Sequence, residues 1–224
     1  MAVLRDESVL KVLPHDSDRE YSAWLLPAVR ECLEGTELRM EDVDAYAVAA
    51  GPGSFTGVRV GLTTVKAWAE VYGKRIVPVS RLEALAAEAS GEPACVGAFA
   101  NAQRSQVFGA VYQRKGTGLV RLGDEMVIAP GKFVETATEF AKGESISWIS
   151  TDAECLVSEE AWKAREMRGE IVECVSSVRA PMIGRMGLAA LAEGRFTDAL
   201  ALDANYVRRP DAEIFWKGIH AHGR

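Results

Sequence analysis

A glycine-rich turn between an apolar run and an amphipathic segment constrains the fold of this chain most strongly. The turn reads GPGSFTG over residues 51–57 and follows the apolar run of residues 45–50. A short run without polar alternation is typical of a strand covered on both faces in an α/β sheet. Gly51 and Gly53 allow backbone angles closed to other residues, and Ser54 can cap a following helix. The sequence therefore predicts a central strand that leads directly into a helix.

The same turn has a functional interpretation, because a helix N-terminus attracts anions through its free N–H groups and its dipole. The groups that could contact a phosphate belong to Gly51, Gly53, Ser54, Thr56, Gly57 and Arg59. A Walker loop, however, requires Lys and then Ser or Thr where Val58 and Arg59 follow the last glycine. The dinucleotide fingerprint would require glycine at Thr56. A structural turn packed under the sheet is therefore favoured over phosphate contact.

Apolar residues recur at spacings of three and four beyond the turn, which predicts one seam of a helix that ends at Gly73. The seam consists of Phe55, Val58, Leu62, Val65, Ala69 and Tyr72. Gly57, Gly61 and Thr64 form a neighbouring stripe of small residues, with Trp68 at its end, where another helix could approach closely. Most such seams belong to a domain core. Contact with an external partner is the alternative.

The segment from Gly51 to Gly61 resembles the GPGSFTG(V/I)R(I/V)G segment of the TsaB family, the bacterial partner subunits in tRNA threonylcarbamoyladenosine synthesis. Further segments similar to that family are SAWLLP at residues 22–27, VPVSRL at residues 77–82 and NYVRR at residues 205–209. The order and spacing of these segments also agree. The resemblance therefore spans most of the chain.

Two departures from the family pattern limit what the resemblance carries over. Family members begin with an apolar strand that ends in an Asp-Thr-Ser-like turn, and nothing of that kind precedes Ala2. We therefore expect the chain to start inside the second strand of its first lobe. The family often has D-A-R-x-G-E-V-Y where residues 101–108 read NAQRSQVF, so that Asn101 and Gln106 replace both acids. Functions of those carboxylates are not carried over.

The resemblance implies an α/β fold of the actin-like, Hsp70-like superfamily, with two ribonuclease-H-like lobes of mixed sheets and flanking helices. We expect an N-terminal lobe over residues 1–95, incomplete at its start, and a C-terminal lobe over residues 96–224 with a loose tail. In the second lobe, apolar patterns predict strands and helices in alternation. The strands are predicted over residues 106–113, 120–128, 146–149 and 171–175, and the helices over residues 133–141 and 181–192.

The resemblance also implies a noncatalytic subunit that binds and activates TsaD. TsaD transfers threonylcarbamoyl to N6 of adenosine 37 in tRNAs that read codons beginning with A. TsaE would join through the complex, and tRNA would be contacted indirectly. No cofactor is expected in the chain alone, and ATP or ADP is expected only at a composite site in the complex. Without TsaD, we expect the partner surface to form a homodimer.

Family complexes use first-lobe helices for the partner contact, which implies an interface on two apolar stripes. The first stripe lies on a helix predicted to follow possible caps at residues 16–18, and it consists of Tyr21, Trp24, Leu25, Ala28 and Val29. The second stripe consists of Phe55, Val58, Gly61, Leu62, Val65, Trp68, Ala69 and Tyr72.

Charge and reactive residues favour a binding protein over an enzyme. The formal net charge of −6 argues against broad contact with a nucleic-acid backbone. The cysteines and histidines lack zinc-site spacing, and no pair of nucleophile and base is recognisable. We therefore expect no catalytic residue and no metal. The alternative is a small actin-fold ATPase or kinase that holds phosphates with Gly51–Gly57 and Arg59, and a peptidase ranks last.

The cysteine pattern and the hydropathy of the chain bear on its location. Cys32 and Cys95 lie in apolar runs, which is typical of small core residues in a reducing compartment. No segment reaches the ~18 uninterrupted apolar residues of a membrane span, and no signal sequence is recognisable at the N-terminus. We therefore expect a cytoplasmic protein without membrane contact.

Overall fold

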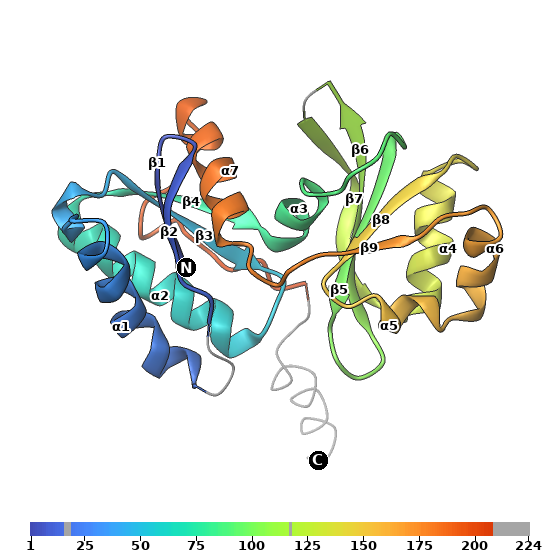
Figure 1. Cartoon of the computed structure of the whole chain (residues 1–224), viewed down its shortest axis with the longest axis horizontal. Helices are drawn as coiled ribbons and strands as arrows, with labels where there is room; N and C mark the ends of the chain where they lie inside the picture. Colours follow the sequence, from blue (N-terminus) through green and yellow to red (C-terminus); the bar gives the residue numbers. More distant parts are fainter. Residues whose placement is uncertain (16–18, 117, 208–224) are drawn as a thin grey trace, which may run out of the picture.

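The strands of the described residues form three sheets, which lie in two lobes (Figure 1). The computed structural model describes residues 1–15, 19–116 and 118–207. The first lobe contains the antiparallel pair β1 (Ala2–Arg5) and β2 (Ser8–Val12) and the parallel pair β3 (Ala45–Gly51) and β4 (Arg75–Ser80). The second lobe holds a five-stranded sheet in the order β7-β6-β5-β8-β9. Its strands are β5 (Cys95–Asn101), β6 (Val107–Lys115), β7 (Gly118–Ile128), β8 (Ile146–Ser150) and β9 (Val172–Cys174).

Helices flank the sheets of both lobes (Figure 1). Those of the first lobe are α1 (Tyr21–Glu34), α2 (Phe55–Tyr72) and α7 (Ala180–Ala192), with the 3-10 turn η1 (Met40–Asp42). Those of the second lobe are α4 (Pro130–Phe140), α5 (Glu154–Val157), η2 (Glu160–Trp162) and α6 (Lys163–Glu166). The short helix α3 (Arg81–Ala86) lies between the lobes.

The centre of the second sheet is β5, which pairs antiparallel with β6 and parallel with β8. Phe99 of β5 packs in one cluster with Phe133 of α4, whereas Val96 packs on the other face with Leu82 of α3. A Cβ atom at Gly109 of β6 would lie 2.5 Å from the Phe133 ring, so that α4 approaches the sheet closely only over a glycine. The sheet is therefore covered on both faces, as its apolar strands require.

The first lobe repeats part of this plan. Its antiparallel pair β1-β2 corresponds to β6-β7, and its parallel pair β3-β4 corresponds to β8-β9. Among the described residues, no strand lies between β1 and β3 where β5 lies in the second sheet. This agrees with the expected mixed α/β lobe without its first strand.

The last helix of the chain packs on the strands of the first lobe. Side chains of α7 share a cluster with Val77 and Val79 of β4. A Cβ atom at Gly187 of α7 would lie 2.5 Å from that of Ala47 in β3, so the glycine permits this close contact. The domain division at residue 95 stays a prediction. Helix α7, however, packs on the first lobe although it follows the second lobe in the sequence, because its apolar face is buried on β3 and β4.

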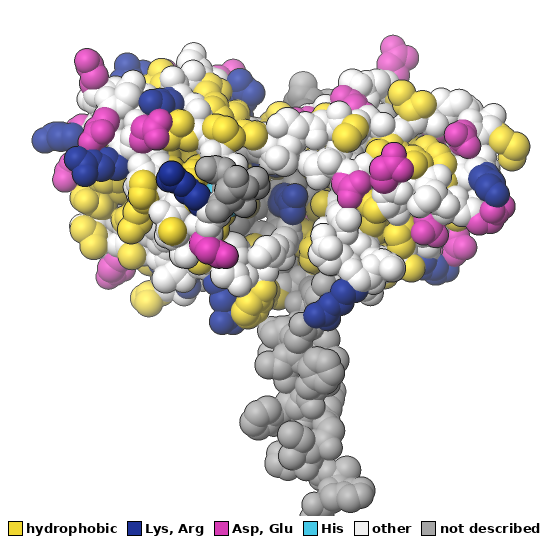
Figure 2. Space-filling model, turned by 60° about the horizontal axis from the view of Figure 1, so that its bottom comes forward, with side chains coloured by type: hydrophobic (Ala, Val, Ile, Leu, Met, Phe, Trp, Pro, Cys, Tyr) yellow, Lys and Arg dark blue, Asp and Glu magenta, His cyan; other side chains and the backbone are white. Residues whose placement is uncertain are grey.

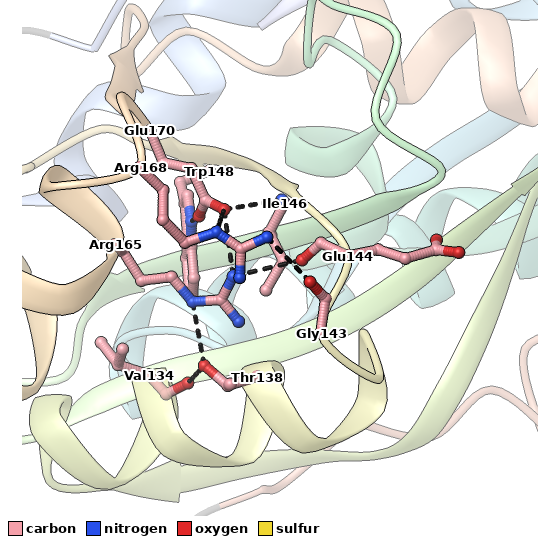
Figure 3. A network of polar contacts seen from close by, with 9 residues as sticks. All are labelled: Val134, Thr138, Gly143, Glu144, Ile146, Trp148, Arg165, Arg168 and Glu170. Carbon is pink, nitrogen blue, oxygen red and sulfur yellow. Dashed lines mark hydrogen bonds and ion pairs between the residues drawn. The ribbon is translucent and has the colours of Figure 1, made fainter.

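A buried ion pair fixes one end of the second lobe (Figure 3). Arg165 Nη1 lies 3.0 Å from Glu170 Oε1, and both side chains are almost fully buried. The carboxylate also accepts the indole N–H of Trp148 at 2.7 Å. The guanidinium donates to Thr138 Oγ1 and to the Glu144 carbonyl oxygen. Because a buried charge is tolerated only when it is paired and hydrogen-bonded, this network joins α6 to α4 and β8.

Removing one partner of this pair should destabilise the fold strongly. We predict that Glu170→Gln lowers the free energy of unfolding by about 3 to 5 kcal/mol, since Arg165 would stay buried without its counter-charge. Glu166 is exposed on α6, the helix that carries Arg165, and Glu166→Gln should change the free energy of unfolding by less than about 0.5 kcal/mol. Urea denaturation of both variants measures this difference, and equal effects would contradict the role given to the pair.

Candidate functional site: the lobe junction and helices α1 and α2

The glycine-rich turn links β3 to α2 as the sequence predicts. The Ser54 hydroxyl accepts a hydrogen bond from the Gly57 N–H at 3.4 Å, which caps α2. Gly51 has a φ of 125°, and the peptide bond to Pro52 is cis. A Cβ atom at Gly51 would lie 2.6 Å from the carbonyl oxygen of Asn205. Glycine is therefore required where the turn meets a returning segment of the chain.

That returning segment comprises residues 197–207 and lies along the turn and β4. Thr197 pairs with Ile76 in a β-bridge, and Asn205 N–H donates to the Ala50 carbonyl oxygen at 2.8 Å. The Tyr206 ring packs against Phe55 at a centroid distance of 5.4 Å. The NYVRR motif thus lies against the GPGSF turn, although its residues 208–209 are outside the described part of the chain.

Arg59, the cation predicted for phosphate contact, is engaged within the chain. Its Nε donates to the Tyr206 hydroxyl oxygen at 2.8 Å, and its guanidinium lies 4.0 Å from the centroid of the Phe55 ring. The Gly57 N–H is likewise occupied by the Ser54 cap. Phosphate contact by Gly51, Gly53, Ser54, Thr56, Gly57 and Arg59 stays a prediction, and two of its donors already have partners.

A buried carboxylate joins the two lobes next to this turn. The side chain of Glu125, on β7, is only 3% exposed. It accepts hydrogen bonds from the Ser80 hydroxyl and, at 2.5 Å, from Asn205 Nδ2. Arg121 Nη1 lies 3.6 Å away. Burial and the charge of Glu125 raise the pKa of the neighbouring Tyr112 hydroxyl. Glu125 therefore connects the second sheet to the end of β4 and to the returning segment.

The two apolar stripes predicted as a partner surface are mostly buried inside the chain. Trp24, Leu25 and Ala28 of α1 form a cluster. Its partly buried members are Met1, Leu13, Val29 and, on α2, Val60. On α2, the buried members are Leu62, Val65 and Ala69. They pack against β3, and Val58 and Trp68 lie at the edge of their cluster. The reason is physical: both helices cover strands that would otherwise expose apolar faces.

Few members of the stripes are exposed to solvent. Gly61 and Tyr72 are half-buried, whereas Tyr21 and Phe55 are exposed, and Phe55 contacts Tyr206. The interface assignment stays a prediction, but its buried members have partners within this chain.

Other residues of α1 and α2 present apolar side chains to solvent. Leu26 is 58% exposed and Val71 is 74% exposed. Ala23, Pro27 and Ala67 are exposed beside them. Sequence periodicity missed these positions because they lie off the apolar seams. The available signal was the presence of Leu26 and Val71 outside the helical seam that the neighbouring residues define.

The lobe junction was also missed by sequence reasoning. Glu125 follows Asp124 on β7 and belongs to no recognisable motif, and Arg81 and Arg179 are single cations at the starts of α3 and α7. Within residues 1–15, 19–116 and 118–207, no group of three or more His, Cys, Asp or Glu side chains is placed to hold a metal ion. In the same residues, no helix is long and apolar enough to cross a membrane.

One lobe has the strand order β7-β6-β5-β8-β9, and the other has a partial copy of it. This pair of lobes defines an actin-like α/β protein. A model of the family described as "TsaD: tRNA N6-adenosine threonylcarbamoyltransferase" matches residues 8–166. The chain therefore belongs to this family. The predicted resemblance to TsaB proteins is also confirmed, since the chain is 34% identical over 115 residues to the tRNA threonylcarbamoyladenosine biosynthesis protein TsaB of Bacillus subtilis.

Further similarities extend this comparison. The chain is 40% identical over 73 residues to the tRNA N6-adenosine threonylcarbamoyltransferase of Ehrlichia chaffeensis. The match to the Bacillus protein covers 51% of this chain and 50% of that protein. The match to the Ehrlichia protein covers 33% of this chain and 21% of that protein. The chain therefore spans half or less of the length of these relatives. The structure of YeaZ from Pseudomonas aeruginosa superposes with a TM-score of 0.64 at 23% identity, covering 92% of both chains. This likeness confirms the fold.

The contact between Gly51 and Asn205 predicts a specific cost for a side chain at this glycine. Gly51→Ala should destabilise the protein by about 3 kcal/mol or more, because it combines a disfavoured φ with a collision against the backbone. Gly73→Ala is the matched control, since Gly73 also has a positive φ but no atom near its Cβ position. It should cost about 1 to 2 kcal/mol. If thermal or urea unfolding showed equal losses of stability for Gly51→Ala and Gly73→Ala, the contact between Gly51 and Asn205 would be contradicted.

Burial raises the pKa of the Glu83 carboxyl above its ordinary value of 4.5, although the positive charge of Arg195 opposes the shift. The folded protein therefore holds the Glu83 proton more tightly than the unfolded chain does. The protonated carboxyl stabilises the fold below about pH 4.5, and this stabilisation is lost as the pH rises through the raised pKa of the folded state. We predict that Glu83→Gln stabilises the protein at about pH 7 more than at about pH 4. Urea unfolding at both pH values tests this, with the exposed Glu92→Gln as control. A gain independent of pH would contradict it.

Proposed function

We propose that this chain is a noncatalytic TsaB-type subunit that binds TsaD directly and activates it. The observation that carries the proposal is the family match over residues 8–166 together with the similarity to Bacillus TsaB. In the reaction, TsaD transfers threonylcarbamoyl to N6 of adenosine 37 of tRNAs that read codons beginning with A. The subunit supplies a binding surface, while TsaE joins through the complex and tRNA is contacted indirectly.

We place the partner surface on the exposed sides of α1 and α2. Figure 2 shows hydrophobic side chains among charged ones on the first lobe. The substantially exposed apolar positions of the two helices, Leu26 and Val71, give this surface anchors that folding itself does not use. Specific interfaces need well-packed apolar contacts at their centre and a polar rim. The charged residues of α1 around Leu26, such as Arg30 and Glu34, suit such a rim.

The same surface forms a homodimer when TsaD is absent, and we assign ATP or ADP only to a composite site in the complex. We place the protein in the cytoplasm. The competing function, a small ATPase or kinase that uses Gly51–Gly57, is less well supported because Arg59 and the Gly57 N–H are engaged within the chain. Turnover of ATP by the purified chain alone would favour that alternative.

The direct experiment is to purify this chain together with TsaD from the same source and to measure the mass of the product by light scattering. A heteromer supports the proposal. Separate elution of two folded proteins would contradict it.

Substitutions on the exposed helix faces should weaken this complex without unfolding the subunit. We predict that Leu26→Asp and Val71→Asp each reduce the affinity for TsaD by at least about tenfold, because a carboxylate would be buried unpaired in the interface. Val120→Asp, at a half-exposed apolar position of the second lobe, is the matched control. Leu62→Asp should instead unfold the protein, since Leu62 is buried against β3. Undiminished binding by both helix variants would exclude this surface.

A further inference from the structure

Three exposed side chains form a cluster at the start of α2. Phe55 packs against the ring of Tyr206, with the ring centroids 5.4 Å apart. The Arg59 guanidinium lies 4.0 Å from the centroid of the Phe55 ring, and its Nε donates to the Tyr206 hydroxyl oxygen at 2.8 Å. All three side chains are exposed to solvent. These residues, which we call the head cluster, join α2 to a segment that lies far away in the sequence.

The head cluster is continuous with the partner surface that we propose on α2. Arg59 is followed at intervals of four residues by Thr63, Ala67 and Val71, and all of these are exposed. Side chains at this interval form a ridge on a helix surface, so the ridge connects the head cluster to Val71. Tyrosine and arginine are also enriched among the residues that carry most of the binding energy of interfaces. The head cluster thus has the position and the composition of a part of this interface.

Contacts with the second lobe hold the head cluster in place. Asn205, the residue before Tyr206, donates from Nδ2 to Glu125 Oε2 at 2.5 Å. Its backbone N–H donates to the Ala50 carbonyl oxygen at 2.8 Å. The Glu125 side chain is only 3% exposed, so its carboxylate depends on protein donors such as Asn205 and Ser80. The position of the Tyr206 ring therefore follows from the contacts of Asn205 with both lobes.

We propose that Glu125 is a positioning residue for the TsaD surface: through Asn205, it holds Tyr206 against the start of α2. The inference rests on the proposed function, because it takes the head cluster as part of the surface that binds TsaD. Glu125 itself is buried and does not touch the partner. The affinity of the first lobe for TsaD consequently depends on a side chain of the second lobe.

Asn205→Asp tests this role with an almost isosteric change. The new carboxylate would face the Glu125 carboxylate, and two like charges this close in a buried site do not both stay ionised. Arg121, 3.6 Å from Glu125, can balance only one of them. The segment should therefore move away and release the Tyr206 ring. We expect the affinity for TsaD, measured by titration calorimetry, to fall by at least about tenfold. Unchanged affinity would overturn the proposal.

Adding Glu125→Gln to Asn205→Asp gives a rescue variant, because the pair exchanges donor and acceptor and keeps the wild-type charge. The new amide can donate to the new carboxylate, so the affinity should return to within about threefold of wild type. Leu200→Asp is the matched control, since it places the same charge on the returning segment at a side chain that is 92% exposed. It should leave the affinity unchanged. No recovery in the double variant, or an equal loss in Leu200→Asp, would overturn the role of Glu125.

Tyr206→Ala tests whether Glu125 acts through the head cluster. Tyr206 is exposed, so this variant should fold even if Asn205→Asp does not. It should weaken TsaD binding by at least about tenfold, because it removes the ring that Asn205 positions. In the Tyr206→Ala background, Asn205→Asp should weaken binding by less than about a further twofold, since coupled residues are not additive. Wild-type affinity in Tyr206→Ala, or additive losses, would overturn the proposed route.

Hydrogen–deuterium exchange of the chain without TsaD separates this inference from the proposed function. Asn205→Asp should speed exchange in residues 200–206 by at least about tenfold and leave β5 unchanged, because only the local contacts of the segment are lost. The rescue variant should reverse the change. Equal exchange in wild type and Asn205→Asp would overturn the positioning role. If the expected exchange is found but wild type does not bind TsaD, the proposed function is overturned and the placement of the head cluster by Glu125 is supported.

Discussion

The hydrogen bonds of the Glu125 carboxylate are the contacts on which the junction between the two lobes depends. The carboxylate is buried between the second sheet, the end of β4 and the returning segment, and it accepts hydrogen bonds from Ser80 and Asn205. A buried charge is stable only with such partners. Asn205 in turn fills the space over Gly51. Glu125 therefore links the second sheet, the end of β4 and the segment that lies over the glycine-rich turn.

Much of the fold could be predicted from the sequence because its signals are local. The apolar run before Gly51, the Ser54 cap and the glycine that ends α2 all have the predicted structure. Cys32 and Cys95 are buried as expected. The caps expected at residues 16–18 lie outside the described residues.

The candidate site was less predictable because it depends on contacts between distant parts of the chain. A seam such as Leu62 and Val65 has the same periodicity whether it faces a strand or a partner helix, and only the structure shows β3 beneath it. Glu125 and Arg179 are charged residues that belong to no recognisable motif. Their importance comes from burial, which local sequence does not report. Family resemblance likewise indicated a partner surface without deciding which side of α1 and α2 is free.

Together these features describe an actin-like scaffold. Its helices α1 and α2 cover strands with one side and expose Leu26 and Val71 on the other, where we propose that TsaD binds. Hydrogen–deuterium exchange of the chain, with and without TsaD, tests this claim most directly. The account predicts that binding slows exchange in α1 and α2 and leaves β5–β9 unchanged. Protection confined to the second lobe, with α1 and α2 unaffected, would contradict it.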